Sequence, residues 1–167
     1  MQYAKCGGYL VSKTLVAFAS KGGASKEAAK IIADELKSKH CLEVDVVDLR
    51  KDKKKLSNID QYNYVVVGSG VRSGKVYDEA LDFLKKDFAN KKLAFFVCSG
   101  DAGDPEKYEE ARTKYVNNVL ANYPNLTTVD TEAFGGRQKM LGRTVFDNFN
   151  PTKISGWAEN LGNKLLV

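Results

Sequence analysis

The residues best suited to hold a ligand form three short segments rich in glycine and serine. They are residues 20–25, 68–74 and 99–103, and each begins where an apolar run of strand length ends. Small residues let backbone amide groups approach a ligand closely, which bulky side chains prevent. Three such segments in one chain predict a ligand site made largely of main-chain atoms.

The first segment, Ser20-Lys21-Gly22-Gly23-Ala24-Ser25, leads straight into a predicted helix. Its two adjacent glycines let successive N–H groups converge, and the start of the helix adds positive potential. Ser20 and Ser25 supply hydroxyl donors on either side. These features predict a site for a phosphate monoester. The alternative is an ordinary turn between a strand and a helix.

Other phosphate motifs and side-chain chemistry do not fit the sequence. Residues 68–74 have one residue too many before the last glycine for a dinucleotide loop, and they follow the third strand instead of the first. Val76 stands where a P-loop needs Ser or Thr to bind magnesium. His40 is the only histidine and follows the first helix, away from the segments above. We therefore predict no metal and no catalytic side chain, with a cofactor supplying the chemistry.

Apolar periodicity supplies the elements that position these segments. Strands are predicted at residues 14–19, 42–49, 64–67, 93–98 and 126–134. Helices are predicted between and after them, and the last two open with the cap-then-proline pairs Asp104-Pro105 and Asn150-Pro151. Strands that alternate with helices form a parallel sheet covered on both faces, with ligands bound beyond the carboxyl ends of the strands. We predict a single α/β domain over residues 1–167, with residues 1–12 as a loosely attached extension.

Composition and charge limit the kinds of binding partner and the location that the sequence favours. Lys and Arg total 26 against 21 Asp and Glu, a formal charge of +5 that suits an acidic partner. The densest basic run, residues 50–55, has no interleaved aromatics, so we predict a solvated loop and no nucleic-acid binding. We predict no signal peptide, and the sequence contains no apolar run of about 20 residues, enough to span a bilayer. Cys6, Cys41 and Cys98 are widely spaced and odd in number, which indicates reduced thiols in a cytoplasmic protein.

The segment after the fifth strand, residues 135–149, is longer than the usual connection of about two to six residues. It carries Arg137, Lys139 and Arg143 at the edge of the sheet where the three small-residue segments lie. Charge-assisted hydrogen bonds from these side chains would suit the carboxylates of a tetrapyrrole. The alternative is a solvated loop.

One loop for a phosphate and two to flank a flat ring indicate flavin mononucleotide (FMN) as the cofactor. The first segment resembles the phosphate loop of flavodoxins, Ser/Thr-x-Thr-Gly-x-Thr, with Gly22 in place of the middle Thr and Ser25 in place of the last. Residues 68–75 are similar to the corresponding loop of flavodoxin-type, menaquinone-dependent protoporphyrinogen oxidases. The likeness extends from about Lys13 to the C-terminus.

The resemblance implies a flavodoxin-like three-layer sandwich around a five-stranded parallel sheet of order 2-1-3-4-5, with FMN bound at its edge. The cofactor contacts that it implies are Ser20, Lys21, Gly22, Gly23, Ala24 and Ser25 at the phosphate, Ser69, Gly70, Val71 and Arg72 on one side of the ring, and Ser99, Gly100, Asp101 and Gly103 on the other. Unlike typical flavodoxins, the chain is basic and has Val71 and Ala102 near the places of their stacking aromatics. Tyr77 and Tyr108 are further candidates for ring contact, whereas Cys98 and Trp157 are interpreted as core residues.

We expect an FMN-dependent oxidoreductase that moves electrons from a reduced substrate to a quinone or another acceptor. Protoporphyrinogen, bound by Arg137 and Arg143, is the specific substrate considered. One alternative is a flavodoxin-like electron carrier that docks acidic redox proteins and has no substrate of its own. Another is a flavin-free interaction domain. A quinone acceptor would bring peripheral membrane contact to an otherwise cytoplasmic protein.

Overall fold

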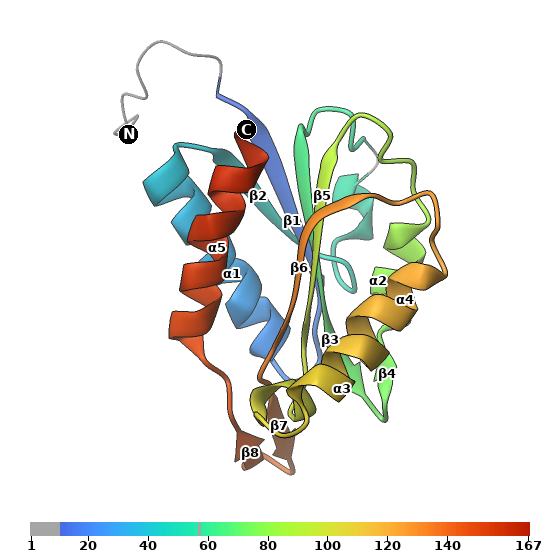
Figure 1. The fold of residues 1–167 in the computed structure, drawn as a ribbon, viewed down its shortest axis with the longest axis vertical. Coiled ribbons are helices and arrows are strands. Elements are labelled where there is room, and N and C mark those ends of the chain that lie inside the picture. The colour runs from blue at the N-terminus through green and yellow to red at the C-terminus, as the bar shows by residue number, and fades with distance from the viewer. Residues whose placement is uncertain (1–10, 57) are drawn as a thin grey trace.

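Five parallel strands form the centre of the molecule (Figure 1). The computed structural model describes residues 11–56 and 58–167, and the strands run in the order β2-β1-β3-β5-β6. Their bounds are Lys13–Ala19 for β1, Glu43–Asp48 for β2, Tyr64–Arg72 for β3, Lys92–Cys98 for β5 and Thr128–Phe134 for β6. A short strand, β4 (Lys75–Val76), pairs antiparallel with the end of β3. Without β4, the observed order is the predicted 2-1-3-4-5, which is confirmed.

Helices cover both faces of the sheet and complete the predicted three-layer sandwich (Figure 1). Helices α1 (Ala24–His40) and α5 (Pro151–Leu165) lie side by side on one face. The other face carries α2 (Asp78–Leu84) and a segmented helix made of α3 (Tyr108–Arg112), a π-helical turn (Thr113–Asn117) and α4 (Asn118–Ala121). Two short 3-10 turns, η1 (Lys53–Leu56) and η2 (Asp101–Gly103), lie in the connections.

The composition of each strand explains its place in the sheet. Strands β1 and β5 are apolar at nearly every position and buried on both faces, as central parallel strands are. Strand β2 carries exposed and half-buried polar residues between buried ones, because it forms an edge of the sheet. Beneath α5, Phe134 and Trp157 pack edge to face with their ring centroids 5.6 Å apart. Trp157 is therefore a core residue, as its helical spacing predicts.

A capping residue fixes where α5 begins. Asn150 Oδ1 accepts a hydrogen bond from the backbone N–H of Lys153 at 3.1 Å, and Pro151 occupies the first turn. The helix therefore begins where the sequence predicts. The other cap-then-proline pair behaves differently, because Asp104 opens a turn and α3 begins only at Tyr108.

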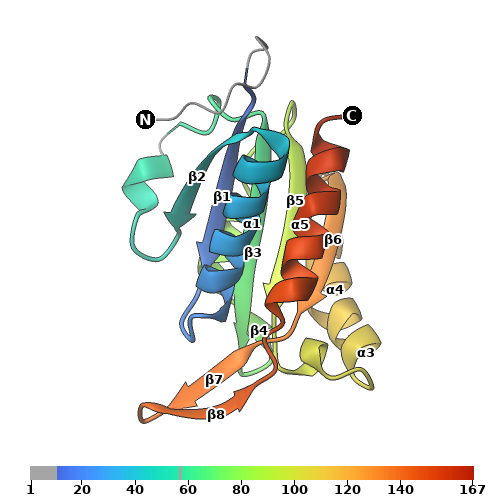
Figure 2. The same cartoon turned by 90° about the vertical axis from the view of Figure 1, so that its left-hand side faces the viewer.

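Two segments that the sequence predicts as loops are β-hairpins. Strand β3 continues to Arg72 and turns back into β4 through Ser73 and Gly74, whose φ angles are 52° and 73°. Residues 135–149 contain two antiparallel strands, β7 (Arg137–Met140) and β8 (Arg143–Asp147). Figure 2 shows this β7–β8 hairpin projecting beyond the end of the sheet. Both hairpins lie at the carboxyl ends of the parallel strands, where the ligand site is predicted.

Three further expectations concern the N-terminus, the thiols and the membrane. Residues 1–10 lie outside the described residues, so the predicted extension over residues 1–12 is described only at Val11 and Ser12. Cys41 is disulfide-bonded, so the prediction of reduced thiols is wrong at this position, whereas Cys98 is a free and buried thiol. No helix in the described part of the chain is both long and apolar enough to cross a membrane.

Candidate functional site

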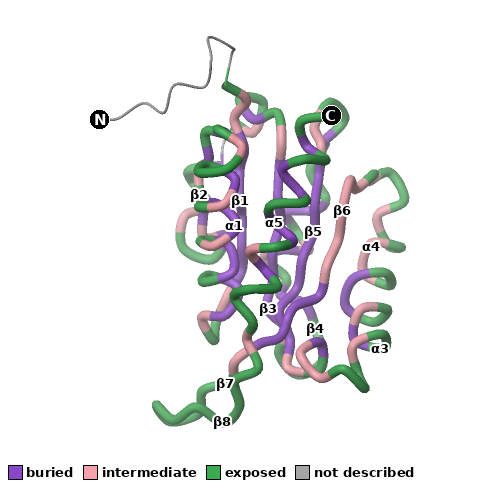
Figure 3. Tube along the Cα trace, turned by 60° about the vertical axis from the view of Figure 1, so that its left-hand side comes forward, coloured by how far each residue is buried: buried purple, intermediate pink, exposed green. Residues whose placement is uncertain are grey.

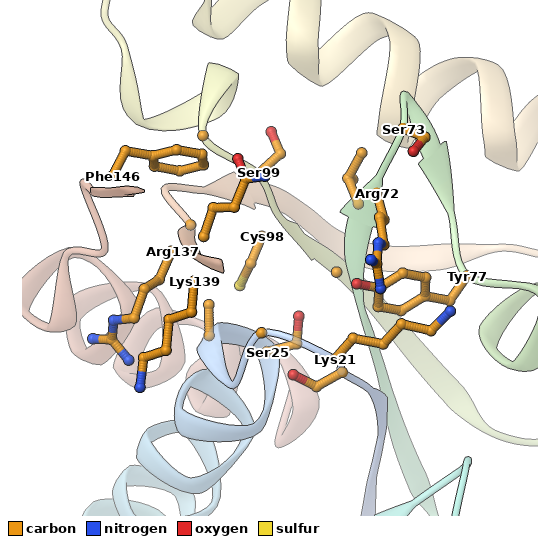
Figure 4. Close-up of a pocket in the computed structure, with 18 of the residues that line it drawn as sticks. Lys21, Ser25, Arg72, Ser73, Tyr77, Cys98, Ser99, Arg137, Lys139 and Phe146 are labelled. Atoms are coloured by element: carbon orange, nitrogen blue, oxygen red, sulfur yellow. The ribbon is translucent and has the colours of Figure 1, made fainter. Parts of the chain in front are cut away.

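A cavity of about 520 Å³ opens at the carboxyl ends of β1, β3 and β5 (Figure 4). This volume lies within the range of about 300–1,000 Å³ that is typical of small-ligand sites. Most of the predicted cofactor residues line it: Ser20, Lys21, Gly22, Ala24, Ser25, Gly70, Val71, Arg72, Ser99 and Gly100. The structure thus brings all three small-residue segments together around one space.

The first segment presents the start of α1 to the cavity. Gly23 takes the left-handed conformation (φ 91°), and its N–H donates to Ser20 Oγ at 3.1 Å, which closes the loop. Within residues 11–56 and 58–167 no side chain caps α1, so the first N–H groups of this helix have no side-chain acceptor there. Ser25 lines the cavity with its Oγ buried and without a hydrogen-bond partner of normal geometry. This segment therefore offers unused donors to an anion.

Arg50 stabilises the first segment, residues 20–25, by a hydrogen bond to its backbone. Its Nη1 donates to the carbonyl oxygen of Ser20 at 3.1 Å, and its Nε forms an ion pair with Glu79 at 3.3 Å. The sequence places Arg50 in a solvated basic loop, but the structure uses its guanidinium to tie that loop to the ligand edge. The backbone of the segment is consequently fixed before any ligand binds.

The second segment reaches the cavity through its backbone and through Tyr77. Ser69 is fully buried and does not line the cavity, because its hydroxyl donates to Gly70 O at 2.8 Å and accepts from Tyr77 N at 3.2 Å. The predicted contact of Ser69 with the ring is therefore replaced by a role in shaping the loop. The Tyr77 ring packs against Gly70 and lines the cavity, with Lys21 Nζ 5.1 Å from its centroid. Burial raises the pKa of the Tyr77 hydroxyl.

The third segment contributes Ser99 and Gly100 but not its later residues. Ser99 Oγ accepts a hydrogen bond from the N–H of Ala102 at 3.1 Å, which stabilises the turn of this loop. Asp101 does not line this cavity and forms an ion pair with Lys107 at 3.8 Å. Gly103 is also outside the lining, because the protein itself fills the space beside it.

The space beside the third segment is filled by Asn148, which follows the β7–β8 hairpin. Its Nδ2 donates to Gly100 O at 2.7 Å, and its Oδ1 accepts from Gly136 N at 2.9 Å. A side-chain atom on Gly103 would lie 2.3 Å from the Asn148 carboxamide carbon. Asn148 therefore locks the base of the hairpin onto the third loop.

The hairpin brings an aromatic ring that the sequence analysis missed. Phe146 lines the cavity, and its ring lies so close to Gly100 that an added Cβ would meet it at 2.5 Å (Figure 4). The site is therefore less poor in aromatics than Val71 and Ala102 imply, since Phe146 and Tyr77 both line it. The hairpin adds Gly136, Gln138 and Met140 to the lining as well. A glycine turn followed by the β-prone residues 144–146 is the signal that could have indicated a hairpin here.

The two arginines predicted to bind substrate differ in position. Arg137 lines the cavity, but its guanidinium is already paired with Glu27 and Asp147, both at 2.9 Å. These ion pairs raise the pKa of Arg137 and tie the hairpin to α1. Arg143 does not line the cavity and lies exposed on the projecting part of the hairpin, so its assignment as a substrate ligand stays a prediction.

The cavity carries positive charge without a compensating acid in its lining. Lys21, Arg72 and Lys139 line it, and none of them forms a salt bridge within the described residues. No Asp or Glu is among the lining residues in the described part of the chain. Cys98 lies at the floor beside Ser25 with its thiol fully buried, which raises its pKa to about 12 and keeps it neutral. The site therefore favours an anionic ligand.

These features fit a ligand with a phosphate and a flat ring. The unused donors at the start of α1 and the buried Ser25 hydroxyl suit the phosphate. The glycine-lined walls and the rings of Phe146 and Tyr77 suit a planar ring system. In the absence of carboxylates, the three unpaired cations add to the attraction for an anion.

Comparisons with known proteins agree with this geometry. A curated relative, the protoporphyrinogen IX dehydrogenase [quinone] of Escherichia coli K12, is 27% identical over 113 residues. The match covers 66% of this chain and 61% of the relative, so it spans less than two thirds of the relative's length. The same values hold for the dehydrogenase of Escherichia coli O157:H7.

Solved structures show the same fold at low sequence identity. Oxidised flavodoxin 2 from Bacillus cereus has a TM-score of 0.57 and 21% identity, over 93% of this chain and 98% of that one. Rubredoxin oxygen:oxidoreductase from Desulfovibrio gigas has a TM-score of 0.62 and 14% identity, over 92% of this chain but only 35% of that one. The flavodoxin domain model matches residues 15–151. The chain therefore belongs to the flavodoxin domain family, and FMN is the cofactor of its site.

Proposed function

We propose that the chain is an FMN-dependent oxidoreductase that oxidises a flat, carboxylate-bearing substrate of the porphyrinogen class and passes the electrons to a quinone. The observation that carries this proposal is the charge of the cavity, whose described lining residues include Lys21, Arg72 and Lys139 and no Asp or Glu. An open cationic mouth favours an anionic substrate. The likeness to a dehydrogenase of protoporphyrinogen IX supports the choice of substrate class.

When bound, FMN would supply the redox chemistry, the transfer of electrons from the reduced substrate to the acceptor. The chain binds and orients the reactants. The start of α1 and Ser25 hold the phosphate, and the fixed loop behind them prevents the site from shifting. Each two-electron oxidation of the substrate then reduces one quinone to a quinol.

Two cations at the cavity mouth are available to hold substrate carboxylates. Arg72 extends from the end of β3, and Lys139 from β7, so that they approach the cavity from different elements (Figure 4). Arg137 lies beside Lys139 (Figure 4), but its two carboxylate partners leave it a structural role. We therefore assign the substrate contacts to Arg72 and Lys139 in place of the predicted pair of arginines.

Proton transfer does not require a side chain of this cavity. Burial raises the pKa of the Cys98 thiol to about 12 and also raises the pKa of Tyr77. Neither group exchanges a proton with solvent near neutral pH. Protons released by the substrate leave through water at the open mouth, and the rate should show no ionisation of Cys98 or Tyr77 between about pH 6 and 9.

Anaerobic turnover of protoporphyrinogen with a soluble quinone tests the proposal. The FMN-loaded protein should form protoporphyrin, followed by its absorbance and fluorescence. Arg72→Gln and Lys139→Gln should each raise KM about tenfold through loss of a charge-assisted hydrogen bond, with little change in kcat. Lys30→Gln, an exposed cation on α1 outside the cavity, is the matched control.

The alternative is an electron carrier with no substrate of its own. An exposed cationic mouth would then dock acidic redox proteins. Absence of turnover, together with rapid salt-sensitive electron exchange with an acidic redox partner, would support the carrier. Turnover that is indifferent to both cation substitutions would leave an oxidoreductase but contradict the assigned substrate contacts.

A further inference from the structure

Exposed apolar side chains gather on the β7–β8 hairpin. Met140, Leu141 and Val145 are 57%, 98% and 57% exposed, and Phe146 is 37% exposed. The hairpin projects from the body of the molecule and is exposed along nearly its whole length (Figures 2 and 3). Apart from this cluster, the large exposed apolar side chains of the described residues are Val11, Val46, Leu166 and Val167. The cluster at the hairpin is therefore a distinct surface feature.

The turn of the hairpin holds Leu141 at a conformational cost. Leu141 and Gly142 form the turn with φ angles of 51° and 77°. A two-residue turn with two positive φ angles favours Asn-Gly or Gly-Gly, because a branched apolar side chain is strained in the left-handed region. Leu141 does not compensate this strain by burial within the chain, since it is 98% exposed. No burial among the described residues accounts for an apolar side chain at this position.

Positive charge flanks the apolar tip. Lys139 and Arg143 lie on either side of Met140 and Leu141, and neither has a salt-bridge partner among the described residues. The one carboxylate of the hairpin, Asp147, is paired with Arg137 at 2.9 Å. The tip therefore combines protruding apolar side chains with unpaired cations, which is complementary to a surface that is negative outside and apolar beneath.

We propose that the tip of the β7–β8 hairpin inserts into the headgroup region of an anionic lipid bilayer. Arg143, which lies outside the cavity lining, would contact lipid phosphates, while Leu141 and Met140 would enter the acyl boundary. A second copy of the chain is a poorer occupant, because a narrow tip supplies much less than the roughly 1,200 Å² that specific protein interfaces bury. An acidic protein would satisfy the cations, but it would need a hollow to receive a convex apolar tip.

Docking in this way directs the cavity toward the lipid. Phe146 and Met140 belong to the hairpin and also line the cavity, so the inserted tip and the cavity mouth share one side of the molecule. Lipid binding itself does not require the proposed function to be correct. The benefit of lipid binding does rest on the proposed function, because a quinone dissolved in the bilayer would then reach the cofactor without crossing water.

Flotation of the FMN-loaded protein with vesicles tests the proposal. Vesicles of phosphatidylcholine containing about one quarter phosphatidylglycerol should carry the protein, and pure phosphatidylcholine should carry much less. Leu141→Asn, which suits the left-handed turn and removes the apolar group, should lower the partition coefficient about tenfold. Arg143→Gln should lower it about fivefold. The matched controls are Leu166→Asn and Lys30→Gln, away from the hairpin, which should leave it unchanged.

A second measurement separates insertion from adsorption. In a Leu141→Trp variant, tryptophan emission should shift to shorter wavelength when anionic vesicles are added, whereas charge adsorption alone would leave it unshifted. The proposal is overturned if the wild-type protein does not float, if Leu141→Asn floats as well as the wild type, or if the variant instead abolishes a dimer seen by light scattering. Failure of the proposed function gives a different result, namely flotation with an intact hairpin effect but no porphyrinogen oxidation.

Discussion

Replacing Ser25 by alanine should move two measurements in opposite directions. Ser25 Oγ is buried at the start of α1 and has no hydrogen-bond partner of normal geometry among the described residues. An unsatisfied buried hydroxyl costs about 1–3 kcal/mol, and alanine has the higher helix propensity. Some of this gain is offset by the small void that the oxygen leaves. We expect the FMN-free protein to become about 1 kcal/mol more stable, which raises Tm by about 2–4 °C.

The same substitution should weaken FMN binding, because it removes a donor to the phosphate. A hydrogen bond to a charged group contributes about 1.5–3 kcal/mol, which corresponds to an increase in Kd of about 10- to 150-fold. Riboflavin has the same ring but no phosphate. Its Kd should therefore be the same for the wild type and for Ser25→Ala, which assigns the loss to the phosphate.

Quenching of flavin fluorescence gives both affinities, and thermal unfolding of the FMN-free protein gives the stability. Ser38→Ala, near the exposed end of the same helix, is the matched control and should change neither affinity. The reasoning is refuted if Ser25→Ala lowers the stability of the empty protein while FMN binds as before. In that case the hydroxyl is already satisfied inside the chain, with the adjacent Cys98 thiol as the nearest candidate, and the phosphate lies elsewhere.

Three further substitutions test other parts of the structure. Asn148→Ala removes both side-chain hydrogen bonds at the base of the β7–β8 hairpin and should lower the local stability of the hairpin by about 1 kcal/mol. Amide exchange in residues 137–147 should therefore accelerate while Tm stays the same. Unchanged exchange would show that Asn148 does not hold the hairpin in place. Gly68→Ala places a Cβ 2.0 Å from the buried Phe96 ring and should lower the free energy of unfolding in urea by about 1–3 kcal/mol or more. Because burial raises the pKa of the Cys98 thiol from 9.0 to about 12, its contribution to stability is present below pH 9 and is lost as the pH rises toward 12. Cys98→Ala should therefore flatten the fall in stability over that interval, and an identical fall in both proteins would refute the assignment.

Sequence reasoning located the central strands and the ligand edge because these depend on strong local signals. The run of β-branched apolar residues 65–67 favours a buried strand, and it lies fully buried in β3. Asn150-Pro151 marks the start of α5 because a side-chain acceptor and a fixed φ act within one turn. Signals of this kind need no knowledge of what packs against them.

The sequence does not predict the hairpins, because their strands bury few apolar side chains. All residues of β8 are exposed, so the apolar alternation that identifies a strand has no reason to be present. The turn at Leu141 lacks the Asn-Gly pair that usually indicates a two-residue hairpin. The position of Phe146 over Gly100 depends on this hairpin and on the Asn148 clamp, both of which join residues far apart in the sequence.

The glycines of the ligand loops predict the position of the ligand site, but the close approach of a cofactor explains only some of them. The sequence suggests that they let a cofactor approach the backbone, and Gly23 does need its left-handed φ of 91°. At other positions the protein itself occupies the space. A Cβ on Gly22 would lie 2.9 Å from Arg137 O, and one on Gly100 would lie 2.5 Å from the Phe146 ring. Glycine at these positions therefore lets the β7–β8 hairpin pack onto the loops, so the loops and the hairpin form one structural unit. A larger residue in either loop would displace the hairpin, and with it the aromatic wall of the cavity.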